Sequence, residues 1–212
     1  MAEAGVCAKQ EDSLPCVILA GGLSRRMGGG DKCLMPLAGR PVLAHVIARL
    51  WPQCGRLALN ANGDPARFGG FGLPVLPDGV PDFPGPLAGV LAAMGWAESL
   101  GASAVVTAAA DTPFLPNDLI DRLRAAAAGG AAIAESPDEG GLARAHPTVG
   151  LWPVALRKDL ADALAAGEHR IGRWADAIGA GRATFPIAPH DPFFNINTPD
   201  DLDEAERIAT LL

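Results

Sequence analysis

Short apolar runs alternate with amphipathic segments over the first 130 residues of the chain. The apolar run at residues 15–20 predicts a strand buried on both faces. Further strands are predicted at 56–60, 73–76 and 104–110. Helices are predicted at 41–51, at 87–100, and from Pro116 to the glycines at 129 and 130. This alternation predicts βαβ units and a largely parallel sheet.

The second half of the chain is less regular. Strands are expected near Ile133, over 148–152 and near 184–185, and helices over 155–166 and 171–178. A final helix begins at Thr198-Pro199, where a capping hydroxyl precedes a proline and two acids. We therefore expect an α/β fold in three layers, with a doubly wound, mostly parallel sheet. Residues 15–212 are expected to form a single domain after a flexible N-terminal extension over 1–14.

Composition narrows the function classes. The hydrophobic fraction of 49% argues against disorder, and the net charge of -7 argues against a nucleic-acid-binding surface. The cysteines form no C-x-x-C pair and no zinc-like cluster, which indicates reduced thiols; they are Cys7, Cys16, Cys33 and Cys54. The sequence shows neither a signal peptide nor a long uncharged apolar run, so we expect a cytoplasmic protein without a membrane contact.

Polar residues follow four of the predicted strands. Gly21, Asn60, Asp78 and Asp111 each come just after an apolar run. If these strands are parallel, the four residues share one rim of the sheet, where ligands bind in doubly wound folds. A single polar residue at a strand end is usually a solvated turn, whereas four beside a glycine-rich loop favour a binding site.

The glycine-rich loop at residues 19–32 is the strongest candidate for phosphate binding. Five glycines fall within residues 21–30, flanked by Arg25, Arg26 and Lys32. Glycine lets backbone N–H groups converge on an anion, and the cations add charge. The loop lacks the G-x-G-x-x-G spacing of dinucleotide-binding domains, and Cys33 after Lys32 breaks the Walker A pattern. A different kind of polyphosphate site is therefore predicted.

The loop resembles a known pattern. Leu19-Ala20-Gly21-Gly22, followed by Arg25-Arg26-Met27-Gly28-Gly29-Gly30-Asp31-Lys32, resembles nucleotidyltransferases that activate small molecules with NTPs. In this form it is similar to the molybdenum cofactor guanylyltransferases, the MobA family. Further matches lie at 85–89, 146–148 and 195–199, and the resemblance covers about residues 16–212.

The resemblance implies a Rossmann-like nucleotidyltransferase fold and a reaction. GMP would pass from GTP to Mo-molybdopterin, giving the guanine dinucleotide cofactor and pyrophosphate, with Mg²⁺ on Asp111. The implied catalytic residues are Lys32, Asp111 and Arg26. The implied GTP contacts are Leu19, Ala20, Gly21, Gly22, Lys32, Asn60, Asp78 and Asp111. Asn195 and Asn197 would border the pterin.

Several residues keep a second interpretation. Asp111 also fits a turn cap, and either Arg25 or Arg26 fits a solvated surface residue. Asn195 and Asn197 fit ordinary helix-entry capping. His146 precedes a proline and is expected to be structural, because an anionic attacking phosphate needs no general base. His169 and Arg170 fit either a contact to the pterin phosphate or a solvated helix end.

The resemblance also implies partners, and it leaves rival functions. A monomer is expected, with transient contacts to molybdopterin-loading proteins and molybdoenzyme chaperones. The nearest rivals are a molybdopterin cytidylyltransferase and a guanylyltransferase for another phosphorylated acceptor. A non-catalytic nucleotide-binding protein is the rival from another class. Turnover with each NTP separates them.

Overall fold

The central feature of the fold is a seven-stranded sheet. The computed structural model describes residues 13–21, 31–79, 85–138 and 140–211. The strands lie in the order β5-β4-β1-β6-β8-β7-β9. Their bounds are β1 (Pro15–Leu19), β4 (Arg56–Asn60), β5 (Val75–Leu76), β6 (Ala104–Ala109), β7 (Ala132–Pro137), β8 (Ala143–Pro153) and β9 (Gly181–Thr184).

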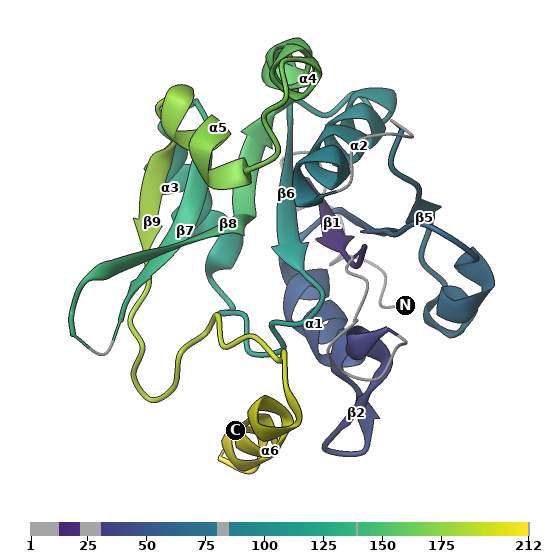
Figure 1. Ribbon diagram of the computed structural model, residues 1–212, viewed down its shortest axis with the longest axis vertical. Helices are drawn as coiled ribbons and strands as arrows, with labels where there is room; N and C mark the ends of the chain where they lie inside the picture. The colour runs from purple at the N-terminus through teal and green to yellow at the C-terminus, as the bar shows by residue number, and fades with distance from the viewer. Residues whose placement is uncertain (1–12, 22–30, 80–84, 139, 212) are drawn as a thin grey trace, which may run out of the picture.

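The sheet is mixed, with parallel pairings in the majority. The pairs β4–β5, β1–β4, β1–β6 and β7–β9 are parallel, whereas β8 runs antiparallel to both β6 and β7. The predicted parallel sheet of the first half is confirmed. The carboxyl ends of β1 and β6 point towards the end of the molecule where α6 (Pro199–Ala209) lies (Figure 1).

Helices cover both faces of the sheet, which confirms the three-layer architecture. One layer contains α1 (Val42–Leu50) and α3 (Leu119–Ala127); the other contains α2 (Pro86–Ser99), α4 (Arg157–Ala165) and α5 (Ile171–Ala177). Strand β1 shows why both layers are needed. Cys16 and Ile18 belong to one buried cluster, and Val17 and Leu19 to the other. A strand buried on both faces reads as a continuous apolar run.

A third cluster of buried side chains lies outside these two layers. It joins α6 to the start of α1 and to the turn after β6 through Leu37, Val42, Phe114, Ile196, Ala205 and Ile208. The cap of α6 forms as predicted: Thr198 Oγ1 accepts the N–H of Asp201, whose carboxylate accepts the N–H of Thr198. The C-terminal helix is therefore fixed beside the carboxyl ends of β1 and β6.

Some predicted boundaries were wrong. Helix α3 begins at Leu119 rather than at Pro116, and β9 ends at Thr184 instead of including Phe185. Strand β8 starts at Ala143, well before the apolar run at 148–152, because its first three residues are exposed and gave no hydrophobic signal. The two-residue strands β2 (Pro36–Leu37) and β3 (Arg40–Pro41) are too short to leave a periodic pattern.

Two expectations fall on the edges of the described chain. The extension predicted over residues 1–14 lies almost wholly outside the described residues, and the boundary at residue 15 stays a prediction. In the part of the chain that the structure describes, no helix is both long enough and apolar enough to cross a membrane.

Candidate active site

The ends of three adjacent parallel strands form the centre of the candidate site. The N–H of Ala20, just after β1, donates to the carbonyl of Asn60 at 2.8 Å, and the N–H of Ala110 donates to the carbonyl of Leu19 at 3.1 Å. These bonds extend the ladder past β1 and bring Asn60 and Asp111 to either side of the chain at Leu19 and Ala20. The predicted shared rim is confirmed for these strands.

The glycine loop enters and leaves the described residues at this rim. Leu19 and Ala20 are almost fully buried, and a Cβ at Gly21 would meet no heavy atom of a described residue within 4 Å. Gly22, Arg25 and Arg26 lie outside the described residues, so their predicted phosphate contacts stay predictions. The chain is described again from Asp31, which caps the short 3-10 helix η2 (Lys32–Leu34).

Lys32 connects two distant parts of the sequence. Its Nζ lies 3.4 Å from Oδ2 of Asp111 and donates to Oδ1 of Asn197 at 2.7 Å. The Lys32 and Asp111 side chains are only 18% and 22% exposed, so water screens their attraction less than at an open surface. A partly buried cation thus stands beside the carboxylate that follows β6.

Two opposing effects act on the pKa of Asp111. Burial raises the pKa of its carboxyl group, while the Lys32 ammonium group acts in the opposite direction. The Asp111 carboxylate pairs with Lys32, and in the same turn Thr112 Oγ1 donates to the carbonyl of Ala109 at 3.0 Å, while the turn-cap interpretation of Asp111 stays a prediction. The Asp111 side chain is therefore directed into the site.

The donor set at Asp111 fits a hard divalent cation that shares its ligands with a substrate. Magnesium binds to one or two carboxylates and completes its shell with phosphate oxygens and water. Within residues 13–21, 31–79, 85–138 and 140–211, no group of three or more His, Cys, Asp or Glu side chains could hold a metal ion alone. Asp111, next to the predicted phosphate-binding loop, would hold such an ion only together with phosphates.

A second polar network lies at the ends of β4 and β5. Asn60 Nδ2 donates to Oδ1 of Asp78 at 2.8 Å and to the carbonyl of Leu76 at 3.1 Å. Asn62 Nδ2 donates to the other oxygen, Asp78 Oδ2, at 2.6 Å. A Cβ at Gly89 in α2 would lie 2.3 Å from Asn60 Oδ1, so only glycine leaves this amide its place. The network fixes the direction of the Asp78 carboxylate.

The segment before α6 returns to this site. The N–H of Ile196 donates to the carbonyl of Asp111 at 3.1 Å, and the side chain of Asn197 reaches Lys32. Thr198 and Asp201 provide the helix cap, which leaves the Asn197 side chain available for the site. The buried Oδ1 of Asn195 finds no hydrogen-bond partner among the described residues, as expected of an amide that awaits a ligand or water.

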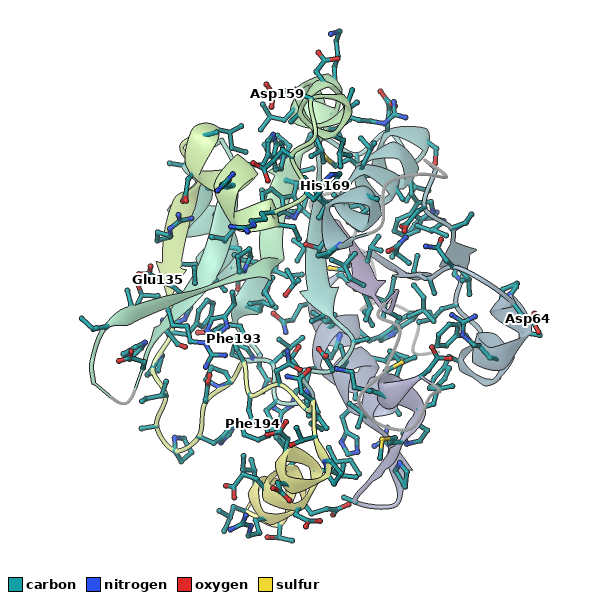
Figure 2. The ribbon with its side chains drawn as sticks, viewed as in Figure 1. Asp64, Glu135, Asp159, His169, Phe193 and Phe194 are labelled. Atoms are coloured by element: carbon teal, nitrogen blue, oxygen red, sulfur yellow. The ribbon has the colours of Figure 1, made fainter. Side chains whose placement is uncertain are left out.

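The histidines have structural surroundings. His146 is buried, its Nε2 lies 2.8 Å from Ser136 Oγ, and its ring stacks on Phe193 at 4.4 Å. Burial lowers the pKa of His146 to about 4, so the ring is neutral near pH 7. Figure 2 shows Phe193 and Phe194 in the segment that leads to α6. The backbone N–H groups of His169 and Arg170 both donate to Glu168 Oε1, and a contact of these residues with a pterin phosphate stays a prediction.

Sequence reasoning missed three residues beside the site: Asp31, Asn62 and Arg67. Asn62 holds Asp78, and Arg67 Nε forms an ion pair of 2.6 Å with Asp31 Oδ2. Asn62 had a usable signal, since it stands two positions after Asn60 at the same strand end. Arg67 had none, because its ion-pair partner Asp31 lies 36 residues earlier in the chain.

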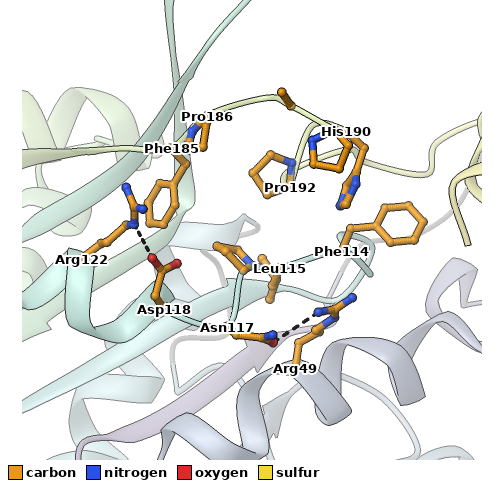
Figure 3. A pocket seen from close by; sticks show the side chains of 13 residues that line it. Arg49, Phe114, Leu115, Asn117, Asp118, Arg122, Phe185, Pro186, His190 and Pro192 are labelled. Carbon is orange, nitrogen blue, oxygen red and sulfur yellow. Dashed lines mark hydrogen bonds and ion pairs between the residues drawn. The ribbon is translucent and has the colours of Figure 1, made fainter. Parts of the chain in front are cut away.

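A separate pocket of about 240 Å³ lies between α1, α3 and the segment after β9 (Figure 3). None of the predicted site residues lines it. Its two arginines are already engaged: Arg49 donates to Asn117 at 3.3 Å, and Arg122 pairs with Asp118 at 2.6 Å. The predicted site residues and this pocket are therefore distinct features.

Comparison with known proteins adds the family. Residues 16–180 match the model of the MobA-like NTP transferase domain. The chain is 51% identical over 207 residues to a molybdenum cofactor guanylyltransferase from Bradyrhizobium sp., with 94% of each chain covered. It is 54% identical over 199 residues to one from Rhodopseudomonas palustris, covering 92% of this chain and 93% of the relative.

Solved structures agree on the fold. Molybdopterin-guanine dinucleotide biosynthesis protein A from Archaeoglobus fulgidus is similar with a TM-score of 0.70 at 22% identity, covering 94% of this chain and all of the other. A 4-diphosphocytidyl-2C-methyl-D-erythritol synthase from Anaerococcus prevotii has a TM-score of 0.67 at 12% identity, covering 93% and 98%. The fold alone therefore does not select a nucleotide, whereas the family match and the relatives at half identity show that this chain belongs to the MobA-like NTP transferase family.

Proposed function

We propose that this chain transfers GMP from GTP to molybdopterin and releases pyrophosphate. The structural observation that carries the proposal is the position of Lys32 between Asp111 and Asn197, at the exit of a glycine-rich loop. Support also comes from relatives that share half of the sequence over nearly the whole length and are named molybdenum cofactor guanylyltransferases. The nucleotide and the acceptor would thus bind on two sides of Lys32.

In the reaction, an oxygen of the molybdopterin phosphate forms a bond to the α-phosphorus of GTP. The bond from that phosphorus to the bridging oxygen breaks, and the electron pair leaves with pyrophosphate. The attacking phosphate is already an anion, so no general base is required, which agrees with the buried and structural surroundings of His146. Positioning and charge stabilisation would account for most of the acceleration.

Lys32 and Asp111 are the proposed catalytic residues. The Lys32 ammonium group would neutralise charge on the α-phosphate or on the departing pyrophosphate. Asp111 would hold a divalent ion, Mg²⁺ in our proposal, which supplies positive charge to the phosphate oxygens. Arg26 would add a second cation from the loop. Asn197 Oδ1 accepts a hydrogen bond from Lys32 Nζ and would help to orient it.

The nucleoside would bind at the ends of β1, β4 and β5. Backbone groups at Leu19, Ala20, Gly21 and Gly22 would face the base and the phosphates. Asp78 accepts one amide hydrogen bond on each oxygen, and a carboxylate has further acceptor capacity on both. It can therefore accept from the amine of guanine or from a ribose hydroxyl while Asn60 and Asn62 keep it in place.

The acceptor would bind beside α6. The unpartnered Asn195 Oδ1 supports a contact to the pterin, and Asn197 connects that side to Lys32. We also propose that the domain over residues 15–212 works as a monomer in the cytoplasm. It would pass its product to molybdopterin-loading proteins or molybdoenzyme chaperones.

Pyrophosphate release, measured with each of the four NTPs with and without molybdopterin, tests the proposal. We expect release that depends on molybdopterin and prefers GTP. A preference for CTP would replace the proposal with a cytidylyltransferase. Binding of GTP without turnover that depends on any phosphorylated acceptor would replace it with a nucleotide-binding protein.

A further inference from the structure

Arg67 connects segments on both sides of the candidate site. It lies in the 3-10 helix η4 (Pro65–Phe71), which begins after Asp64 at the edge of the molecule (Figure 2). Its guanidinium group donates to the carbonyl of Asn62 at 2.7 Å and to the carbonyl of Asp64 at 2.8 Å. The same group lies 4.6 Å above the ring of Phe68. Arg67 therefore fixes the turn that carries Asn62.

The turn held by Arg67 positions the nucleoside side. Asn62 donates to Asp78 Oδ2 at 2.6 Å and accepts the Asp78 N–H on its own Oδ1 at 2.9 Å. This reciprocal pair sets both the backbone and the carboxylate of Asp78. Gly63 follows with φ of +84°, and a Cβ there would come within 3.2 Å of the Arg67 guanidinium group. Glycine thus permits both the turn and the close approach of the arginine.

The remaining edge of the guanidinium group reaches the phosphate side. Arg67 Nε lies 2.6 Å from Asp31 Oδ2 in an ion pair that lacks hydrogen-bond geometry, with the two side chains 27% and 19% exposed. Asp31 directly precedes Lys32 and accepts the N–H of Leu34 on its carbonyl at 2.9 Å, which holds the start of η2. A shift of Asp31 would therefore move the backbone from which Lys32 extends.

We propose that Arg67 is a positioning residue that sets the spacing between Asp78 and Lys32, and so between the nucleoside and the phosphates of GTP. The inference rests on the proposed function. It assigns Arg67 no contact with the substrate: it acts through Asn62 on one side and through Asp31 on the other. A planar fork with several fixed donors can hold both at once, whereas a lysine ammonium group is a single point charge.

The test compares Arg67→Lys with Arg122→Lys. Arg122 is a matched control, because its Nε pairs with Asp118 at 2.6 Å, it donates to the Thr184 carbonyl at 3.3 Å, and it lies 5.2 Å above the Phe185 ring (Figure 3). Its partners lie away from the predicted site residues. Both variants keep the charge and lose the fork.

We expect Arg67→Lys to raise the dissociation constant for GTP about tenfold and to lower kcat/KM for GTP by a similar factor. Arg122→Lys should leave both within about twofold of the wild type, and the unfolding temperatures of the two variants should be similar. GTP binding is measured by calorimetric titration without acceptor, and turnover by pyrophosphate release with molybdopterin. Equal GTP affinity in the wild type and Arg67→Lys would overturn the inference.

A second variant, Asn62→Ala, keeps the inference testable if Arg67→Lys is unstable, and a double-mutant cycle tests the route if it is stable. Asn62→Ala removes the two side-chain hydrogen bonds that hold Asp78, and it should also weaken GTP binding about tenfold. In the Asn62→Ala background, Arg67→Lys should weaken binding by no more than about threefold, because part of its route is already lost. A full tenfold further loss would show that Arg67 does not act through Asn62.

The proposed function and this inference fail differently. A wild-type chain that binds GTP and transfers GMP, with an Arg67→Lys variant that does both equally well, contradicts the inference alone. A wild-type chain that does not bind GTP contradicts both.

Discussion

The two halves of the sheet use polar residues differently. Strands β5, β4, β1 and β6 run parallel, and the residues after them converge on one rim. In the half formed by β8, β7 and β9, polar side chains pair with one another, as Ser136 does with His146 and Thr184 with Glu135. The proposed site residues therefore follow the strands of the parallel half, whereas the polar side chains of the half around β8 hold its own structure.

The half formed by β8, β7 and β9 nevertheless contributes to the site through the segment that follows β9. The segment after β9 crosses back to α6 (Figure 1), and it is anchored where Phe193 packs on His146 at 4.4 Å and on Phe185 at 5.2 Å. This packing holds the segment in a position where Asn197 contacts Lys32. One half therefore holds most of the residues proposed for the chemistry, and the other half directs the chain segment that brings Asn197 beside Lys32.

The largest difference in activity is expected when one carboxylate is neutralised in each half. Asp111→Asn should lower GMP transfer about 10²-fold to 10³-fold, because it removes the proposed metal ligand. Glu135→Gln, in β7, should leave transfer within about twofold. Its carboxylate accepts a hydrogen bond from the Thr184 hydroxyl on the neighbouring strand β9. Pyrophosphate release with GTP and molybdopterin measures both.

Stability should respond to Asp111→Asn in the opposite direction from activity. Burial raises the pKa of Asp111 in the folded chain, so the ionised carboxylate costs folding free energy above that pKa. The uncharged amide removes that cost. We expect an unfolding temperature at pH 7 equal to or above that of the wild type, and a marked decrease would contradict this account of the site.

The next largest effect is expected at Lys32. Lys32→Ala should lower transfer about 10²-fold or more, since a preorganised cation at the phosphates is lost. Lys158→Ala is the matched control in α4, where an exposed lysine pairs with Asp162. Steady-state turnover should separate the two variants, and similar losses in both would remove Lys32 from the catalytic residues.

Much of this comparison could be predicted from the sequence. The sequence was sufficient to predict that Asn60, Asp78 and Asp111 lie together, because each follows an apolar run and parallel strands end at one edge. Contacts such as Lys32–Asn197 were not, since they join residues 165 positions apart that only the path of the last segment brings together. Arg67 lay beyond prediction for the same reason: no periodic pattern marks a side chain that joins three turns.

A smaller effect is expected where α2 approaches the nucleoside side. Gly89→Ala would place a Cβ 2.3 Å from Asn60 Oδ1, and moving that amide should raise KM for GTP about tenfold. Gly95→Ala in the same helix meets only the flexible Arg157 side chain at 3.3 Å. It should leave KM unchanged and stabilise the helix by about 0.5–1 kcal/mol. Unchanged KM in Gly89→Ala would contradict the assigned role of Asn60.

The smallest effect on activity is expected at His146, in the half formed by β8, β7 and β9. Burial lowers its pKa from 6.5 to about 4, so the unfolded chain binds this proton first as the pH falls. Folding stability is therefore lost between pH 6.5 and about pH 4, by about 3 kcal/mol from this group. Chemical denaturation across that range should show a shallower loss for His146→Gln, while transfer at pH 7 stays within about threefold. Identical pH dependence in both proteins would contradict the buried neutral ring.

The central claim is that the rim around Lys32 and Asp111 transfers the nucleotidyl group of GTP to molybdopterin. The most direct measurement follows a label placed at the α-phosphorus of GTP, in parallel with a label at the γ-phosphorus. The account predicts that the α-label enters the molybdopterin product, that the γ-label leaves as pyrophosphate, and that Asp111→Asn abolishes most of both. Appearance of the γ-label on the acceptor, or equal transfer by Asp111→Asn, would contradict it.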